Sequence, residues 1–177
     1  ALAQLVERYN RGDLRAVVQG GTALSARSPR EITLLNLLGA AHAGLGEAAA
    51  AVGWFQKAAS LRPDLAQSHA NLGLALQAAG DDRAAAASFR KALAIGPADP
   101  GVLNNLGAVL ARLGDAEGAV ASYEQALKLA PGYAMAAANL GIALKDAGRM
   151  AAAVEAFERA VAAEPRDVES LCNLAAA

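Results

Sequence analysis

The sequence predicts an all-α solenoid built from antiparallel helix pairs. The triplet Asn-Leu-Gly begins at residues 71, 105 and 139, so the step is 34 residues each time. A fixed period of this length is typical of stacked helix pairs in which each repeat contacts its neighbours. Hydrophobic residues make up 55% of the chain but aromatic residues only 4%, which suits alanine-rich helices in close contact. No alternating β-branched run predicts a strand.

The first helix of a repeat is best seen in residues 66–99. Leu72 and Leu76 lie four residues apart and therefore share one face of this helix. Gly73 lies between them and has no side chain, so we expect a neighbouring helix to approach its backbone closely.

The second helix of the same repeat has a predicted start, core and end. Gly80 is expected to end the first helix in the left-handed conformation, and Asp81 to cap the second helix. Phe89 then fills the space that the surrounding alanines leave. Pro97 stops the second helix and sets the turn into the next repeat.

The repeats divide the whole chain. Residues 1–31 form a degenerate repeat, in which Gly21 replaces the aromatic residue. Four full repeats and one truncated repeat follow at 32–65, 66–99, 100–133, 134–167 and 168–177. No linker separates them, so we expect one elongated domain over residues 1–177. Neither end carries a polar capping helix, which leads us to expect a fragment of a longer protein.

The recurring residues resemble the tetratricopeptide repeat (TPR) family over nearly the whole chain. The resemblance rests on an aromatic series and a proline series with the same 34-residue step: Phe55, Phe89, Tyr123 and Phe157, and Pro63, Pro97, Pro131 and Pro165. It implies a right-handed superhelix of antiparallel helix pairs, in which the first helix of each pair lines a concave groove. The groove positions of the family fall on Asn36, Leu37, Asn71, Leu74, Gln77, Asn104, Asn105, Arg112, Asn139, Ile142, Lys145 and Asn173.

The series Asn71, Asn105, Asn139 and Asn173 resembles the asparagine ladder of O-linked N-acetylglucosamine transferases. An amide carries both a donor and an acceptor, so it can pair with a peptide backbone without reading the side chains. A repeat step of roughly 10 Å between packed helices would place one amide at about every third residue of an extended peptide. The alternative is structural, with each Asn bonding a neighbouring helix or a backbone carbonyl.

Charge and motifs argue against several classes of function. The net charge is −1, which favours neither nucleic-acid nor membrane binding. His42, His69 and Cys172 lack metal-ligand spacing, so we expect no metal, no cofactor and no catalysis in this chain. A clamp for a terminal carboxylate is disfavoured, because the fifth and sixth positions of each repeat carry neither Lys nor Arg.

Three hypotheses of function follow. The first is a protein-interaction module whose groove holds an extended peptide or partner segment. The second is a substrate-docking N-terminal domain of a larger transferase, a glycosyltransferase first and a sulfotransferase or methyltransferase next. The third is a scaffold that self-associates through its uncapped ends. The lack of a signal segment at the start of this sequence and its single cysteine favour the cytoplasm.

Overall fold

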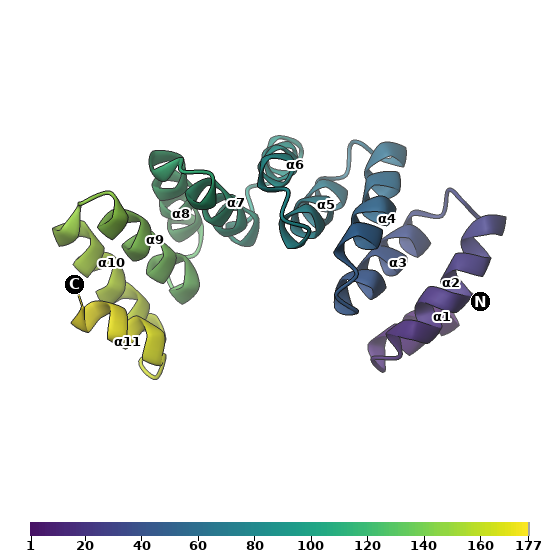
Figure 1. Ribbon diagram of the computed structural model, residues 1–177, viewed down its shortest axis with the longest axis horizontal. Coiled ribbons are helices and arrows are strands. Elements are labelled where there is room, and N and C mark those ends of the chain that lie inside the picture. Colours follow the sequence, from purple (N-terminus) through teal and green to yellow (C-terminus); the bar gives the residue numbers. More distant parts are fainter. Residues whose placement is uncertain (177) are drawn as a thin grey trace. The chain divides into compact units, whose positions relative to one another are not determined.

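A computed structural model describes residues 1–176, and these residues form eleven α-helices and no strand (Figure 1). In chain order the helices are α1 (Leu2–Asn10), α2 (Leu14–Arg27), α3 (Ile32–Gly44), α4 (Ala48–Leu61), α5 (Ala66–Ala78), α6 (Asp82–Ile95), α7 (Pro100–Arg112), α8 (Ala116–Leu129), α9 (Ala134–Asp146), α10 (Met150–Ala163) and α11 (Val168–Ala175). No described helix is both long and apolar enough to cross a membrane.

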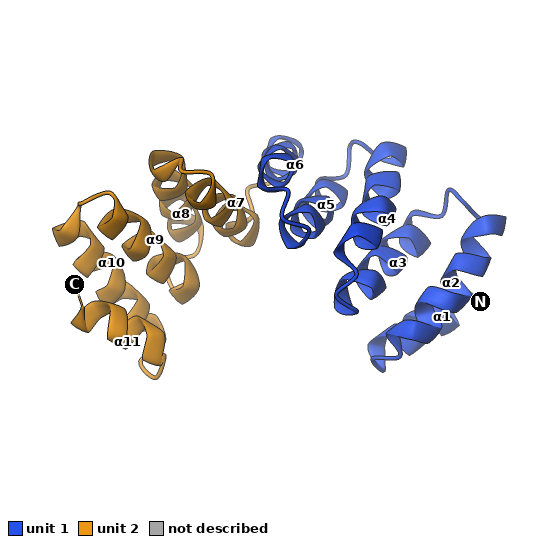
Figure 2. Ribbon diagram, in the orientation of Figure 1, with its two compact units in different colours: residues 1–96 blue, residues 97–177 orange. Residues whose placement is uncertain are grey.

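The chain divides into two compact units, residues 1–96 and residues 97–177, coloured blue and orange in Figure 2. Unit 1 contains α1 to α6, and unit 2 contains α7 to α11. Within each unit, consecutive helices pack against each other in chain order. The arrangement of the two units as one elongated domain, with the repeat boundaries given above, stays a prediction.

The turn inside each helix pair depends on a glycine. Gly12, Gly46, Gly80, Gly114 and Gly148 all have positive φ, between 73° and 81°, a region in which residues with a β-carbon are strained. The expected left-handed end of the first helix at Gly80 is therefore confirmed. The expected cap is also present, because the Asp81 carboxylate accepts a hydrogen bond of 3.0 Å from the Ala84 amide.

A second glycine in each full repeat lies against the aromatic ring of the following helix. A methyl group at Gly73 would lie 2.6 Å from Cε1 of Phe89. The equivalent distances are 2.7 Å for Gly39 and Phe55, 2.7 Å for Gly107 and Tyr123, and 2.4 Å for Gly141 and Phe157. The glycine thus makes room for the aromatic ring, and the close approach expected at Gly73 is found.

In the first helix pair, leucine side chains take the place of the aromatic ring. Gly21 is buried, and a methyl group there would lie 2.7 Å from Leu38 Cδ2. Leu38 belongs to a core cluster with Leu5 and Leu34, against which Trp54 also packs. Leucines from α1 and α3 therefore fill the space that an aromatic residue fills in the later repeats.

Candidate functional site

Every candidate groove residue lies on the first helix of a pair. In unit 1 these residues are Asn36 and Leu37 on α3 and Asn71, Leu74 and Gln77 on α5. In unit 2 they are Asn104, Asn105 and Arg112 on α7, Asn139, Ile142 and Lys145 on α9, and Asn173 on α11. Their surroundings differ, and only some of them line a hollow surface.

Asn71 and Leu74 line an apolar hollow of about 520 Å³ in unit 1, which we call the unit 1 recess. Its other walls come from Tyr9 of α1, from Phe55 of α4, from alanines of α3, α4 and α5, and from Gly44 and Gly46 at the end of α3 and in the turn after it. No charged side chain lines it among the described residues. Leu74 is 46% exposed, so a large apolar side chain is available at the recess surface.

The amide of Asn71 is oriented by its own helix. Gln67, one turn earlier, donates from Nε2 to Asn71 Oδ1 over 2.8 Å. The Asn71 carbonyl oxygen is thus engaged, while its amide group still carries two N–H donors. Asn71 is therefore oriented to donate hydrogen bonds at the edge of the unit 1 recess.

The other candidates of unit 1 are more deeply placed. Leu37 packs against the core cluster of Leu5, Leu34 and Leu38. The side-chain oxygens of Asn36 and Gln77 are buried and have no hydrogen-bond partner among the described residues. Neither residue lines the unit 1 recess.

In unit 2, Asn139 and Ile142 line a smaller hollow of about 200 Å³, the unit 2 recess. Met135 of α9 shares this wall, and it is 59% exposed while Ile142 is 39% exposed. The facing wall carries three acidic residues from the end of α10, the following turn and the start of α11: Glu164, Asp167 and Glu169. This recess therefore combines an apolar floor with a negatively charged rim.

The buried side chain of Asn104 forms hydrogen bonds with two residues of this lining, Met135 and Asn139. It is only 3% exposed, and its Nδ2 donates to the Met135 sulfur over 3.8 Å. Its Oδ1 accepts a hydrogen bond of 3.0 Å from Asn139 Nδ2. With its nitrogen directed to Asn104, Asn139 keeps its carbonyl oxygen as an acceptor. Asn104 thus contacts two residues of the recess lining and does not line the recess itself.

The remaining candidates line neither recess. Asn105 and Asn173 are half-buried, and Lys145 donates from Nζ to the Ala176 carbonyl oxygen over 3.4 Å. Arg112 is exposed, and its positive charge acts on buried Tyr123. Burial raises the pKa of Tyr123 to about 12, and the Arg112 charge opposes this shift.

Both histidines have structural roles in the helix packing. His42 is buried, its Nδ1 lies 2.5 Å from Glu47 Oε2, and its ring stacks on Trp54 with the centroids 6.5 Å apart. His69 Nε2 lies 3.1 Å from the Pro63 carbonyl oxygen. Among residues 1–176, no group of three or more His, Cys, Asp or Glu side chains is placed to hold a metal ion.

Sequence analysis missed the residues that complete each recess. Tyr9 lies in the degenerate repeat, where the family positions are hard to align. Glu164 and Asp167 flank the turn between α10 and α11, outside the first-helix positions that the family resemblance singles out. Glu169 lies at the second position of its repeat, a groove position that was not carried onto this sequence. One signal was available, because three acidic residues cluster within residues 164–169.

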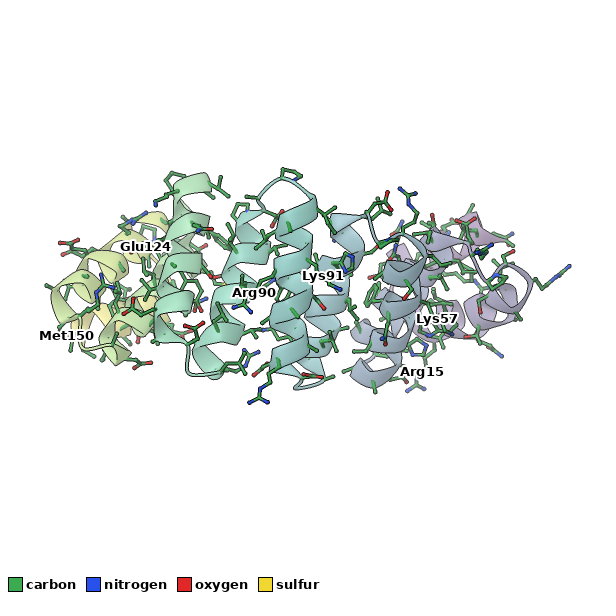
Figure 3. The ribbon with its side chains drawn as sticks, turned by 90° about the horizontal axis from the view of Figure 1, so that it is seen from above. Arg15, Lys57, Arg90, Lys91, Glu124 and Met150 are labelled. Atoms are coloured by element: carbon green, nitrogen blue, oxygen red, sulfur yellow. The ribbon has the colours of Figure 1, made fainter. Side chains whose placement is uncertain are left out.

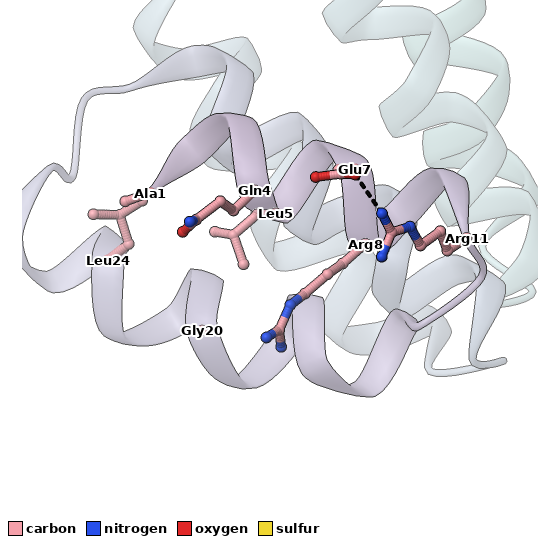
Figure 4. A pocket seen from close by; sticks show the side chains of 8 residues that line it. All are labelled: Ala1, Gln4, Leu5, Glu7, Arg8, Arg11, Gly20 and Leu24. Atoms are coloured by element: carbon pink, nitrogen blue, oxygen red, sulfur yellow. Dashed lines mark hydrogen bonds and ion pairs between the residues drawn. The ribbon is translucent and has the colours of Figure 1, made fainter.

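Other surfaces of the protein carry none of the candidate residues. A hollow of about 430 Å³ between α1 and α2 is lined by Leu5, Leu24 and two arginines, and Glu7 pairs there with Arg11 (Figure 4). Figure 3 labels six side chains of the second helices: Arg15, Lys57, Arg90, Lys91, Glu124 and Met150. Of these, Lys57 places its Nζ 4.3 Å from the centroid of the Trp54 ring.

Comparison with solved structures supports the fold. A crystal structure of MamA is 22% identical and has a TM-score of 0.86, over 92% of this chain and 95% of that chain. MamA from Desulfovibrio magneticus RS-1 is 20% identical and has a TM-score of 0.87, over 94% of each chain. YrrB, described as a TPR protein with an unusual peptide-binding site, is 19% identical, with a TM-score of 0.75 over 90% of this chain and 82% of its own.

Comparison of sequences identifies the repeat directly. Two family models, both described as tetratricopeptide repeat, match residues 68–101 and residues 100–164. A comparison with curated proteins gives no match. The predicted all-α solenoid of helix pairs is confirmed by the eleven described helices and by these relatives. The chain belongs to the tetratricopeptide repeat family.

Proposed function

We propose that this protein is a protein-interaction module that holds an extended segment of a partner protein along the first helices of its repeats. The observation that carries the proposal is the unit 1 recess, where predicted groove residues Asn71 and Leu74 meet in one hollow. Its volume of about 520 Å³ falls within the range of about 300–1,000 Å³ found for ligand sites. YrrB, which shares the fold, is described as having a peptide-binding site.

The chemistry of the recess suits an extended segment with an apolar anchor. The exposed part of Leu74, the ring of Tyr9 and the surrounding alanines offer an apolar surface to one hydrophobic side chain. Asn71 can donate its remaining N–H groups to a backbone carbonyl of the same segment. Affinity would then come from one buried side chain and from main-chain hydrogen bonds that tolerate many sequences.

The same surface would also serve the substrate-docking domain of a larger transferase, because docking uses the same contacts with an extended segment. The proposal therefore concerns what the groove binds.

The test is a binding scan with fluorescently labelled, unstructured peptides, comparing the wild type with Leu74→Ser. The matched control is Leu129→Ser, which replaces another exposed leucine that lies on α8 and lines neither recess. We expect peptides with an apolar anchor to lose affinity in Leu74→Ser by about 5- to 30-fold, since an apolar side chain contact contributes about 1–2 kcal/mol. Leu129→Ser should bind like the wild type.

Two outcomes would reject the proposal. If no extended peptide binds the wild type, the groove does not hold extended segments. If both variants lose the same affinity, or neither does, binding does not use the unit 1 recess.

A further inference from the structure

We infer that the unit 2 recess recognises a lysine or arginine side chain of the bound segment. This inference rests on the proposed function, because it assumes that an extended segment lies along the first helices. With this recess the groove would prefer segments that carry a basic residue. Without it, the groove would bind mainly through the main chain of the segment and one apolar side chain.

Apart from the buried hydroxyl of Ser170, the polar groups that this recess offers are hydrogen-bond acceptors. Glu164, Asp167 and Glu169 each contribute a carboxylate to its lining. Asn139 adds its Oδ1, because its Nδ2 is directed to Asn104. Lysine carries three N–H donors and arginine carries five, with no acceptor in either side chain, so both match a wall of this kind.

No basic side chain of the protein lines this recess among the described residues. Arg166, in the same turn as the acidic residues, is exposed and does not belong to the lining. The Lys145 ammonium group donates to the Ala176 carbonyl oxygen. The negative rim is thus available to a positive charge from a partner.

The floor of the recess suits the aliphatic part of a basic side chain. Met135 is 59% exposed, Ile142 is partly exposed, and both line the same hollow as the carboxylates. Long basic side chains commonly lay their methylene stem on apolar surface and keep the charged end among polar groups. The volume of about 200 Å³ lies below the range of small-molecule sites and therefore fits a single side chain.

The acidic rim is not a property of the repeat itself. The positions of Glu164, Asp167 and Glu169 have counterparts at each earlier junction between repeats. Those counterparts are Ser28, Glu31 and Thr33; Arg62, Leu65 and Gln67; Gly96, Asp99 and Gly101; and Ala130, Tyr133 and Met135. Helix packing therefore does not require three carboxylates here, and only Asp167 has a structural role, as it accepts the Ser170 amide at the start of α11.

The experiment uses a set of labelled, unstructured peptides in which one position holds lysine, arginine, norleucine or glutamate. Norleucine keeps the aliphatic stem of lysine and removes the charge. The set is titrated against the wild type and against Glu164→Gln/Glu169→Gln, which leaves the Asp167 cap intact. The matched control is Glu155→Gln/Glu158→Gln, which removes the same charge from exposed positions on α10.

Exposed ion pairs contribute modestly, so removing two carboxylates should weaken the lysine and arginine peptides by about 2- to 30-fold. The α10 control should bind them like the wild type, and the norleucine peptide should bind all three proteins equally. If lysine and norleucine peptides bind the wild type equally, or if both double variants weaken binding alike, the inference is wrong while the proposed function stands. If no peptide of the set binds, the proposed function fails as well.

Discussion

Gly73 offers a sharp test of how the helices pack. Replacing Gly73 with alanine places a methyl group 2.6 Å from Cε1 of Phe89, a ring that is fully buried. Alanine is about 1 kcal/mol more favourable than glycine inside a helix. Overpacking a well-filled core costs about 1–3 kcal/mol. Helix propensity stabilises the variant and overpacking destabilises it. The effect of Gly73→Ala on the unfolding free energy must therefore be compared with that of another Gly→Ala change, at a site where only helix propensity acts.

Gly53 provides this comparison. Gly53 lies inside α4 and is exposed, and a methyl group added there would have no neighbouring atom within 4 Å. We expect Gly53→Ala to stabilise unit 1 by about 0.5–1 kcal/mol through helix propensity. Gly73→Ala should be less stable than Gly53→Ala by about 1–3 kcal/mol, because this difference isolates the collision with Phe89.

The assay is chemical denaturation followed by helical circular dichroism, with unfolding free energies fitted to a nearest-neighbour repeat scheme. In the background of Phe89→Leu, the penalty at Gly73 should shrink, because the smaller side chain can move away from the methyl group. Equal stabilisation by Gly53→Ala and Gly73→Ala would refute the close packing of α5 on Phe89. An undiminished penalty with Phe89→Leu would assign the cost to another contact.

The remaining predictions concern the core, a turn and a buried phenol. Leu106 is 6% exposed, so Leu106→Ala should lower the unfolding free energy by about 2–5 kcal/mol, and a loss below about 0.5 kcal/mol would contradict its burial. Gly80 has a φ of 81° with open space around it, so Gly80→Ala should cost about 1–2 kcal/mol through backbone strain alone. The pKa of Tyr123 is raised from 10.0 to about 12 in the folded protein, so the neutral phenol favours folding below pH 10 and this contribution is lost as the pH rises to about 12. Since Tyr123 is only 3% exposed, the loss should be about 2–3 kcal/mol, and Tyr123→Phe should flatten the dependence of the unfolding midpoint on pH in that window.

The fold follows closely from the sequence because its decisive residues act locally. Gly80 has a positive φ and Asp81 caps the next helix, and both roles depend only on a few neighbouring backbone atoms. The fit of Gly73 against Phe89 could also be predicted, because the same pair recurs in each full repeat at a constant spacing.

The site was less predictable because its residues interact between helices. Asn104 and Asn139 are bonded although they occupy adjacent rather than equivalent positions in their repeats, so the 34-residue period alone does not pair them. Tyr9 reaches the unit 1 recess from the degenerate repeat. The side-chain directions that bring these residues together depend on helix packing, which a list of equivalent positions does not contain.

The most direct test of backbone binding by the groove replaces Asn71, Asn105 and Asn139 together with alanine and compares this variant with the wild type in the scan of labelled, unstructured peptides. We expect helical circular dichroism to be kept, with a modest loss of stability because Asn104 loses its partner Asn139. Peptides that bind the wild type regardless of most side chains should lose affinity. Collapse of helicity would show that the asparagines are structural, and unchanged peptide binding would show that the groove does not use their amides.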